Sequence, residues 1–207
     1  MIPKNIYILH HKLKMDDDIS KKWTELHPEF EINHFNYQNI ELFFASIPII
    51  YKNIYVKIRD DALKTDFLRF VILNEKGGFV IDSNLEPIHN IDIFPAEKGI
   101  ILSKTMEEND NNIYCNKFIA STPKHPIVER LCNSFVNHYL DGSYFISHYW
   151  KASNLMDLLL DCENDKDVLF LEQKCAHFFY DACFMYKKRR IINDKTPYFS
   201  DSIHFSD

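Results

Sequence analysis

The residues best suited to chemistry follow a short apolar run that begins at a pair of glycines. Gly77-Gly78 leads into Phe79-Val80-Ile81, which ends at Asp82, and Asn84 stands two positions further on. In a β-strand, residues i and i+2 lie on the same side, so we expect Asp82 and Asn84 to reach one ligand together. Carboxylate and amide oxygens are ligands that Mg²⁺ and Mn²⁺ accept. The spacing therefore suits a divalent cation, a phosphate or a sugar hydroxyl.

Each of these residues also has a structural interpretation. Asp and Asn favour turns, and Pro87 follows shortly after Asp82 and Asn84. Asp66 and Arg69 stand three residues apart in a predicted helix, where they can form an ordinary surface ion pair worth a few tenths of a kcal/mol. Residue types and spacing alone leave both interpretations open.

The elements that must position these residues alternate between strands and helices. Residues 6–9 form a compact apolar run and residues 30–35 alternate with period two, so both are predicted strands. Between them, acidic residues at 16–18 and Ser20 supply N-cap candidates for a helix that ends at His27-Pro28. This order predicts two parallel strands joined by a right-handed crossover.

A second helix is predicted over residues 56–75, because apolar residues recur there at spacings of three and four. Asp66 and Arg69 lie on a face next to the apolar one, and Gly77 suits the end of the helix. Residues 38–53 fit either short helices or packed loop. Later segments are shorter, with strands expected over 99–102, 114–120 and 168–171, a polar loop over 105–112, and helices from Pro126 and from Ser153 to Leu160.

Composition and charge narrow the class of protein. The chain has 207 residues, 46% of them hydrophobic, and no internal repeat or linker, which predicts one soluble globular domain over residues 1–207. Its formal net charge of −6 disfavours nucleic acid as a partner. Neither a signal peptide nor an apolar stretch long enough for a membrane span is visible. We therefore expect a cytoplasmic or otherwise non-secreted protein without a membrane anchor.

Three segments in the same order resemble a known family. Residues 2–7 are similar to its first strand, I-P-K-x-I-H, and residues 62–82 to its signature A-x-x-S-D-x-x-R-Y…G-G-x-Y-x-D-x-D. Residues 116–126 resemble its later segment N-x-F-I-x…H-P. The family is that of glycosyltransferases with a DXD-containing sugar-binding region. It includes yeast initiating mannosyltransferases and bacterial capsule enzymes, with the clostridial glucosylating toxins as distant relatives.

The resemblance implies a fold and an activity. The fold is GT-A, an α/β, Rossmann-like domain with a mixed, mostly parallel central sheet flanked by helices, which binds a nucleotide sugar at the carboxyl ends of its strands. The implied activity is that of a hexosyltransferase in polysaccharide biosynthesis or glycosylation. Its donor is a UDP- or GDP-sugar, its acceptor a glycan or glycoprotein, its cofactor Mn²⁺ or Mg²⁺, and the anomeric configuration is retained.

The resemblance also assigns roles to individual residues. Asp82 meets the ribose and the cation, Asp66 accepts hydrogen bonds from the sugar, and Arg69 pairs with Asp66 or with the diphosphate. Asp82 and Arg69 are thus the expected catalytic residues, which stabilise charge on the departing diphosphate. His10 is expected to stack on the nucleobase and Asn116 to bind the donor, although strand-end packing and a structural turn are the respective alternatives.

The metal site is expected to combine Asp82 and Asn84 with His204 from the end of the chain. The chain departs from the family pattern where Asn84 replaces a second Asp and where Val80 and, more mildly, Phe70 replace Tyr. A neutral amide holds a divalent cation less strongly than a carboxylate does. A second hypothesis is therefore a catalytically impaired module that binds a nucleotide sugar or a glycan.

Overall fold

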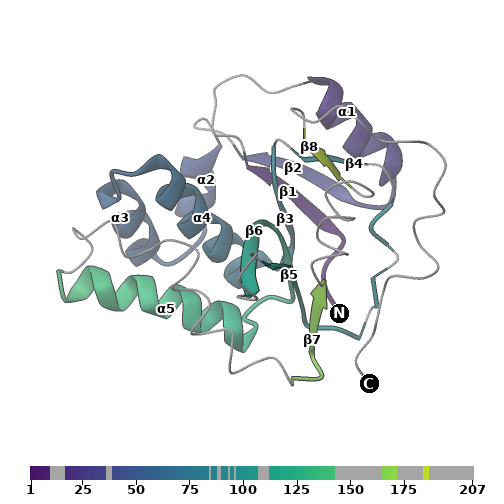
Figure 1. Ribbon diagram of the computed structural model, residues 1–207. Coiled ribbons are helices and arrows are strands. Elements are labelled where there is room, and N and C mark those ends of the chain that lie inside the picture. The colour runs from purple at the N-terminus through teal and green to yellow at the C-terminus, as the bar shows by residue number, and fades with distance from the viewer. Residues whose placement is uncertain are drawn as a thin grey trace.

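A six-stranded sheet with helices on both faces forms the centre of the molecule (Figure 1). The computed structural model describes residues 1–9, 17–35, 39–83, 85–87, 90–92, 94–95, 97–106, 112–142, 165–171 and 184–186, with backbone alone at 17, 62, 86, 104–106, 112–117 and 184–186. None of the helices within these ranges is long and apolar enough to cross a membrane.

The strands of the main sheet stand in the order β2-β1-β3-β6-β5-β7. Their bounds are Glu31–Phe35 (β2), Asn5–Leu9 (β1), Gly78–Asp82 (β3), Asn112–Ser121 (β6), Ile100–Met106 (β5) and Val168–Leu171 (β7). Neighbouring strands are parallel except where β6 meets β3 and β5. The expected α/β fold with a mixed, mostly parallel sheet is confirmed.

Two hydrophobic layers enclose this sheet. The helices α2 (Ile40–Ala45), α3 (Ile49–Lys57), α4 (Asp61–Lys76) and α5 (Pro126–Leu140) cover one face. The helix α1 (Asp17–Leu26) covers the other, together with a two-stranded sheet of β4 (Leu85–Pro87) and β8 (Phe184–Tyr186) (Figure 1). Side chains alternate between these layers along β3, so that Val80 belongs to the first and Ile81 to the second.

The segment β4 is held from two directions. The indole Nε1–H of Trp23 on α1 donates to the carbonyl of Leu85 at 3.0 Å, in the buried interior. β4 also pairs antiparallel with β8. Because Leu85 pairs with Tyr186, this contact joins residues about 100 positions apart in the sequence. Neither β4 nor β8 is predicted from the sequence, because each spans three residues.

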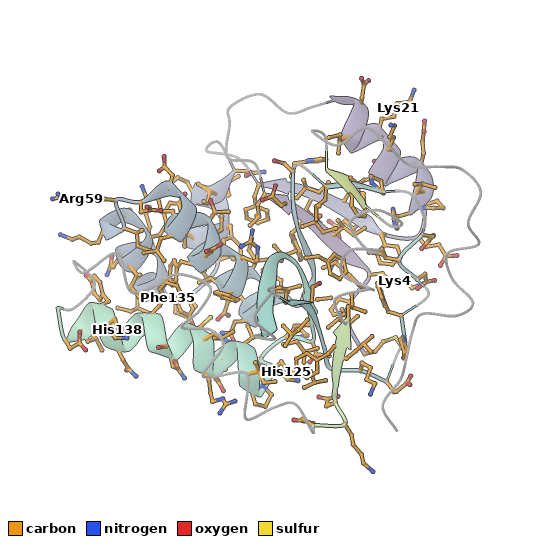
Figure 2. All side chains as sticks on the ribbon, in the orientation of Figure 1. Lys4, Lys21, Arg59, His125, Phe135 and His138 are labelled. Carbon is orange, nitrogen blue, oxygen red and sulfur yellow. The ribbon has the colours of Figure 1, made fainter. Side chains whose placement is uncertain are left out.

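At the other edge of the sheet, a histidine joins α5 to β7. His125 caps α5, since its Nδ1 accepts from the Ile127 N–H at 3.3 Å, while its Nε2 lies 3.1 Å from Asp167 Oδ2 (Figure 2). His125 is 4% exposed. The part of the family-like segment that contains His125-Pro126 therefore has a structural role, and α5 begins at Pro126 as predicted.

Most predicted elements near the N-terminus are confirmed, and one boundary is wrong. The helix predicted over residues 56–75 is two helices, because α3 ends at Lys57 and α4 begins at Asp61. The Asp60 side chain caps α4 by accepting from the Leu63 N–H at 2.8 Å. Residues 38–53 include α2 and the start of α3. Both ends of the polar loop predicted over 105–112 are strand, at 105–106 and at 112. The rest of that loop and the helix predicted from 153 to 160 lie outside the described residues.

The turn between α4 and β3 requires both glycines. Gly77 and Gly78 have φ values of +66° and +90°, where side chains with a Cβ are strained. A Cβ on Gly78 would also lie 2.6 Å from the carbonyl oxygen of Asn5 on β1, and one on Gly77 would lie 2.6 Å from the Pro123 ring. These glycines allow α4 to reverse at once into β3.

Gly78→Ala is expected to lower the free energy of unfolding by about 2–4 kcal/mol, because it adds a clash with backbone to the strain of positive φ. Gly142→Ala is the matched control. Gly142 also has a positive φ, +77°, but no atom of the described residues lies within 4 Å of its Cβ position, so about 1 kcal/mol is expected. Urea denaturation measures both, and equal losses would contradict the close approach of β3 to β1.

Candidate functional site

Asp82 ends β3 at the point of the sheet where open α/β folds bind ligands. From β1 the chain continues to β2 on one side, and later places β3 on the other side. Such a reversal of strand order leaves a crevice at the carboxyl ends of the two strands. Leu9 and Asp82 are the paired last residues of β1 and β3, and the Ser83 N–H donates to the Leu9 carbonyl at 3.1 Å. Asp82 is 5% exposed.

The reversal at Gly77 brings α4 back along β3 to this same end. Asp66 lies about 15 Å along the helix from Lys76, and Asp82 lies about 13 Å along the strand from Gly78. Because α4 packs against β3, these lengths place Asp66 and Asp82 toward the same end of the sheet. Asp82 follows Val80 by two residues and so lies on the sheet face that α4 covers.

Asp66 and Arg69 form a partly buried ion pair, in which the guanidinium is buried and the carboxylate is partly exposed. Arg69 Nη1 donates to Asp66 Oδ1 at 2.5 Å, and the two side chains are 2% and 22% exposed, respectively. The interpretation as an ordinary surface pair is therefore wrong. A buried guanidinium needs its partners, because an unpaired buried charge is costly. Arg69 Nε is also buried and has no hydrogen-bond partner within the described residues, which leaves a donor for a bound ligand or a water.

The strand β6 brings Asn116 to the same edge. Its pairing with β5 passes from Leu102–Ile119 directly to Ser103–Cys115, so residues 116–118 form a large bulge. Pairing with β3 ends at Ile81–Phe118. The backbone of Asn116 therefore lies in this bulge, two residues from the point where pairing with β3 ends, and its role in donor binding stays a prediction.

Ser103 is a buried polar residue that the sequence does not reveal, and it lies on the sheet face opposite to the one that carries Asp82. It lies on β5 next to the bulge, is 2% exposed, and its buried Oγ has no hydrogen-bond partner in the described part of the chain. Buried hydroxyls are normally satisfied. A lone serine in a strand gives no signal of this kind, because its position depends on the register of β5 with β6.

Other expected site residues lie outside the described residues, namely His10, Asn84 and His204. Their roles stay predictions. Because β3 ends at Asp82 and Ser83 lies in a turn, strand alternation no longer relates Asp82 to Asn84. The described residues contain no group of three or more His, Cys, Asp and Glu side chains that could hold a metal ion.

A cysteine nucleophile is not available in the described core. Burial raises the pKa of the Cys132 thiol to about 12, with nearby Glu75 as a further cause. At neutral pH this group therefore stays protonated, and a thiol is a weak nucleophile. Cys132 lies on α5, among apolar side chains that pack on α4. Its role is packing.

Asp66→Asn is expected to destabilise the protein by about 2–4 kcal/mol, because it leaves the buried Arg69 charge unpaired. Glu41→Gln is the control, since the Lys52–Glu41 pair on α2 and α3 is 37% and 59% exposed and such pairs contribute at most about 1 kcal/mol. Urea denaturation at pH 7 compares the two. Similar small losses would show that the Arg69 charge has another partner.

Known proteins similar to this chain agree with this architecture. A family model described as "Capsular polysaccharide synthesis protein" matches residues 17–196. The search of curated proteins found no match. Among solved structures, "PaToxG Glycosyltransferase" is similar with a TM-score of 0.59 and 16% identity, over 80% of this chain and 72% of that one. Another, "Structure of Transferase", has 14% identity over 74% of each chain, and its TM-score of 0.31 is too low to support any argument.

These findings fix the family and the fold. At 16% identity, the likeness to the solved glycosyltransferase concerns the fold, which agrees with the expected α/β architecture. The family model covers most of the chain and places it with capsule proteins, which the resemblance also named. With the family model matched over most of its length, the chain belongs to the capsular polysaccharide synthesis protein family.

Proposed function

We propose that this protein is a glycosyltransferase that moves a hexose from a UDP- or GDP-sugar to an acceptor glycan or glycoprotein during polysaccharide synthesis. The observation that carries the proposal is the position of Asp82 at the carboxyl ends of β1 and β3, together with the Asp66–Arg69 ion pair on α4, the helix that packs on β3. Asp82 is carried by a strand, and Asp66 and Arg69 are carried by a helix rather than by loops, which favours a site that orients a ligand.

Asp66 and Arg69 suit the sugar end of the donor. A carboxylate accepts hydrogen bonds from sugar hydroxyls, and its geometry here is fixed by the 2.5 Å bond from Arg69 Nη1. The buried Arg69 Nε lacks a partner among the described residues and supports a further polar contact. In this proposal Asp82 binds the ribose, Asn116 contacts the donor, and His10 stacks on the base.

The chemistry of Asp82 also fits Mn²⁺ or Mg²⁺, which prefer oxygen ligands. Mg²⁺ is commonly held by one or two carboxylates together with substrate phosphates, so a cluster of three protein ligands is not required. When bound, the cation would neutralise charge that develops on the diphosphate. Asn84 and His204 are the proposed additional ligands.

The reaction exchanges one bond at the anomeric carbon. The bond from this carbon to the diphosphate oxygen breaks with its electron pair going to oxygen, and a bond to the acceptor hydroxyl oxygen forms on the same face. The acceptor proton passes to the departing diphosphate, so a protein base is not needed. Arg69 and Asp66 hold the sugar while this occurs, and the low exposure of both Arg69 and Asp82 limits competing attack by water.

The second candidate function is a binding module without turnover. The neutral Asn84 favours it, since one carboxylate fewer weakens the hold on a cation. This candidate shares the donor site with the first and differs only in the chemical step. Binding and turnover must therefore be measured separately.

A panel of UDP- and GDP-sugars with Mn²⁺ tests the proposal by calorimetric binding and by release of free nucleotide. We expect one donor to bind and to be hydrolysed slowly without acceptor. Asp82→Ala should lower turnover at least about 100-fold, because charge on the diphosphate loses its stabilisation. Asp92→Ala is the control, since Asp92 forms an exposed pair with Lys4 remote from this edge.

Asp82→Asn, with melting temperatures for all variants, separates loss of chemistry from loss of folding. Binding without turnover for any donor would favour the module. If no nucleotide sugar binds at all, both candidate functions are wrong.

Asn84→Asp is expected to tighten Mn²⁺ binding in the presence of nucleotide by about tenfold, because a carboxylate replaces a neutral amide. Titration of Mn²⁺ followed by electron paramagnetic resonance measures this directly. An unchanged dissociation constant would mean that residue 84 is not a ligand.

A further inference from the structure

Exposed apolar side chains gather on the helices α2 and α3. Within the described residues, five large hydrophobic side chains are exposed, and three of them lie on these two helices. They are Leu42 on α2, which is 75% exposed, and Ile49 and Val56 on α3, which are 66% and 57% exposed. Single exposed apolar residues are normal on a protein surface, but a group of them is evidence of a contact surface. The donor site proposed above uses none of the three.

The solvent side of α3 carries an apolar row. Ile49, Asn53 and Val56 stand at positions i, i+4 and i+7, so they lie along one side of the helix. All three are exposed, whereas Tyr51 and Ile54 on the other side are buried. Packing of α3 in the core therefore leaves this row open to solvent.

Basic side chains border the row. At about 100° per residue along a helix, Lys52 lies on one side of it and Lys57 on the other. Arg59 follows just after α3 and projects from the outer side of the molecule (Figure 2). Both Lys57 and Arg59 are exposed. Long basic side chains beside apolar ones suit the boundary of a lipid bilayer, because their aliphatic stems cover apolar surface while their charged ends stay in water.

The helix α2 extends the surface. Lys52 of α3 forms an ion pair with Glu41 of α2, in which both side chains are exposed. The solvent sides of the two helices therefore meet. Leu42, the neighbour of Glu41, is the most exposed of the three apolar residues. We define the α2–α3 surface as Leu42, Ile49, Lys52, Asn53, Val56, Lys57 and Arg59.

The charge of this segment differs in sign from that of the whole chain. Residues 42–59 contain three basic residues and no acidic one, whereas the formal net charge of the protein is −6. A local group of cations is attracted to an anionic surface over about a Debye length, even when the rest of the molecule is acidic. The charge of the α2–α3 surface is thus complementary to an anionic partner.

Acidic residues flank the segment at both ends, and most of their charge is engaged. Glu41 is paired with Lys52. The Asp60 carboxylate caps α4. Asp61 on α4 is exposed, but Lys64 on the same helix adds a cation, and its ammonium lies over an aromatic ring of α3. The basic border of the apolar row therefore keeps its positive charge.

We propose that the α2–α3 surface attaches the protein reversibly to an anionic lipid membrane. Three apolar side chains are too few for the core of a stable protein interface, whereas at a membrane each nearby cation adds attraction to anionic head groups. The helix α3 has nine residues, so it lies on the membrane and does not cross it. This attachment goes beyond the sugar transfer proposed above and does not depend on it.

Co-sedimentation of the full-length protein with vesicles tests the attachment. One set of vesicles holds equal amounts of phosphatidylglycerol and phosphatidylcholine, and the other holds phosphatidylcholine alone. We expect binding to the anionic set only, and less of it at about 0.5 M salt because ions screen the cations. Ile49→Asp and Val56→Asp should each weaken binding about tenfold, since each replaces apolar surface by a charge. Lys57→Gln should weaken it about fivefold.

Two variants on α1 are matched controls, because this helix covers the opposite face of the sheet. Thr24→Asp adds the same negative charge as the aspartate variants of α3, and Lys21→Gln removes the same positive charge as Lys57→Gln. Both Thr24 and Lys21 are exposed. The control variants should bind anionic vesicles as tightly as the wild-type protein does.

Four outcomes would overturn the proposal. The first is a wild-type protein that binds no vesicles, or binds both sets equally. The second is equal weakening by the variants of α1 and of α3. The third is a dimer, detected by analytical ultracentrifugation and lost in Ile49→Asp, which would assign the surface to a second copy. The fourth is a marked fall in the melting temperature of both aspartate variants of α3, which would show that another segment of the chain covers the row.

Discussion

The close approach of β3 to β1 is the constraint on which the arrangement of this protein depends. Two glycines at positive φ let the chain leave α4 and enter β3 with its backbone against that of Asn5. A longer or less sharp turn would shift α4 along the strand by several ångströms. The ion pair on α4 would then no longer stand toward the same end of the sheet as Asp82. The turn at the amino end of β3 thus determines which residues of α4 stand toward its carboxyl end.

Burial of the charged Arg69 side chain costs free energy, and the hydrophobic layers around it offset this cost. Arg69 is among the largest fully buried side chains and is surrounded on its own helix by buried apolar residues, including Phe67 and Phe70. The ring of Phe135 on α5 lies 5.0 Å from that of Phe67, between centroids, which fixes α5 against this part of α4 (Figure 2). Burial of several aromatic side chains, each contributing about 1.5–3 kcal/mol, keeps a desolvated guanidinium in place. Packing of apolar side chains thus supports the polar chemistry at this site.

Local signals predict the first half of the fold well, and the rest depends on tertiary contacts. Apolar runs and the His27-Pro28 stop give β1, α1 and β2. The break at Ile58 between α3 and α4 has no glycine or proline to mark it, so periodicity alone merges the two helices. Spacing places Asp66 and Arg69 one turn apart, but their burial follows from the packing of α4 on β3. The bulge at 116–118 and the burial of Ser103 depend on the register between strands. Sequence patterns do not determine that register to a single residue.

The pairing of β4 with β8 has a consequence for how the protein is made. The strand β4 contacts Trp23, which is synthesised early, through the hydrogen bond to the Leu85 carbonyl. It also pairs with residues 184–186, which are synthesised late. Contacts between residues so distant in sequence form slowly. During synthesis the sheet through β3 can assemble while the strand that flanks its ligand edge is still missing. The edge around Asp82 is therefore completed last, so a nascent or shortened chain holds the core of the fold before it holds the finished site.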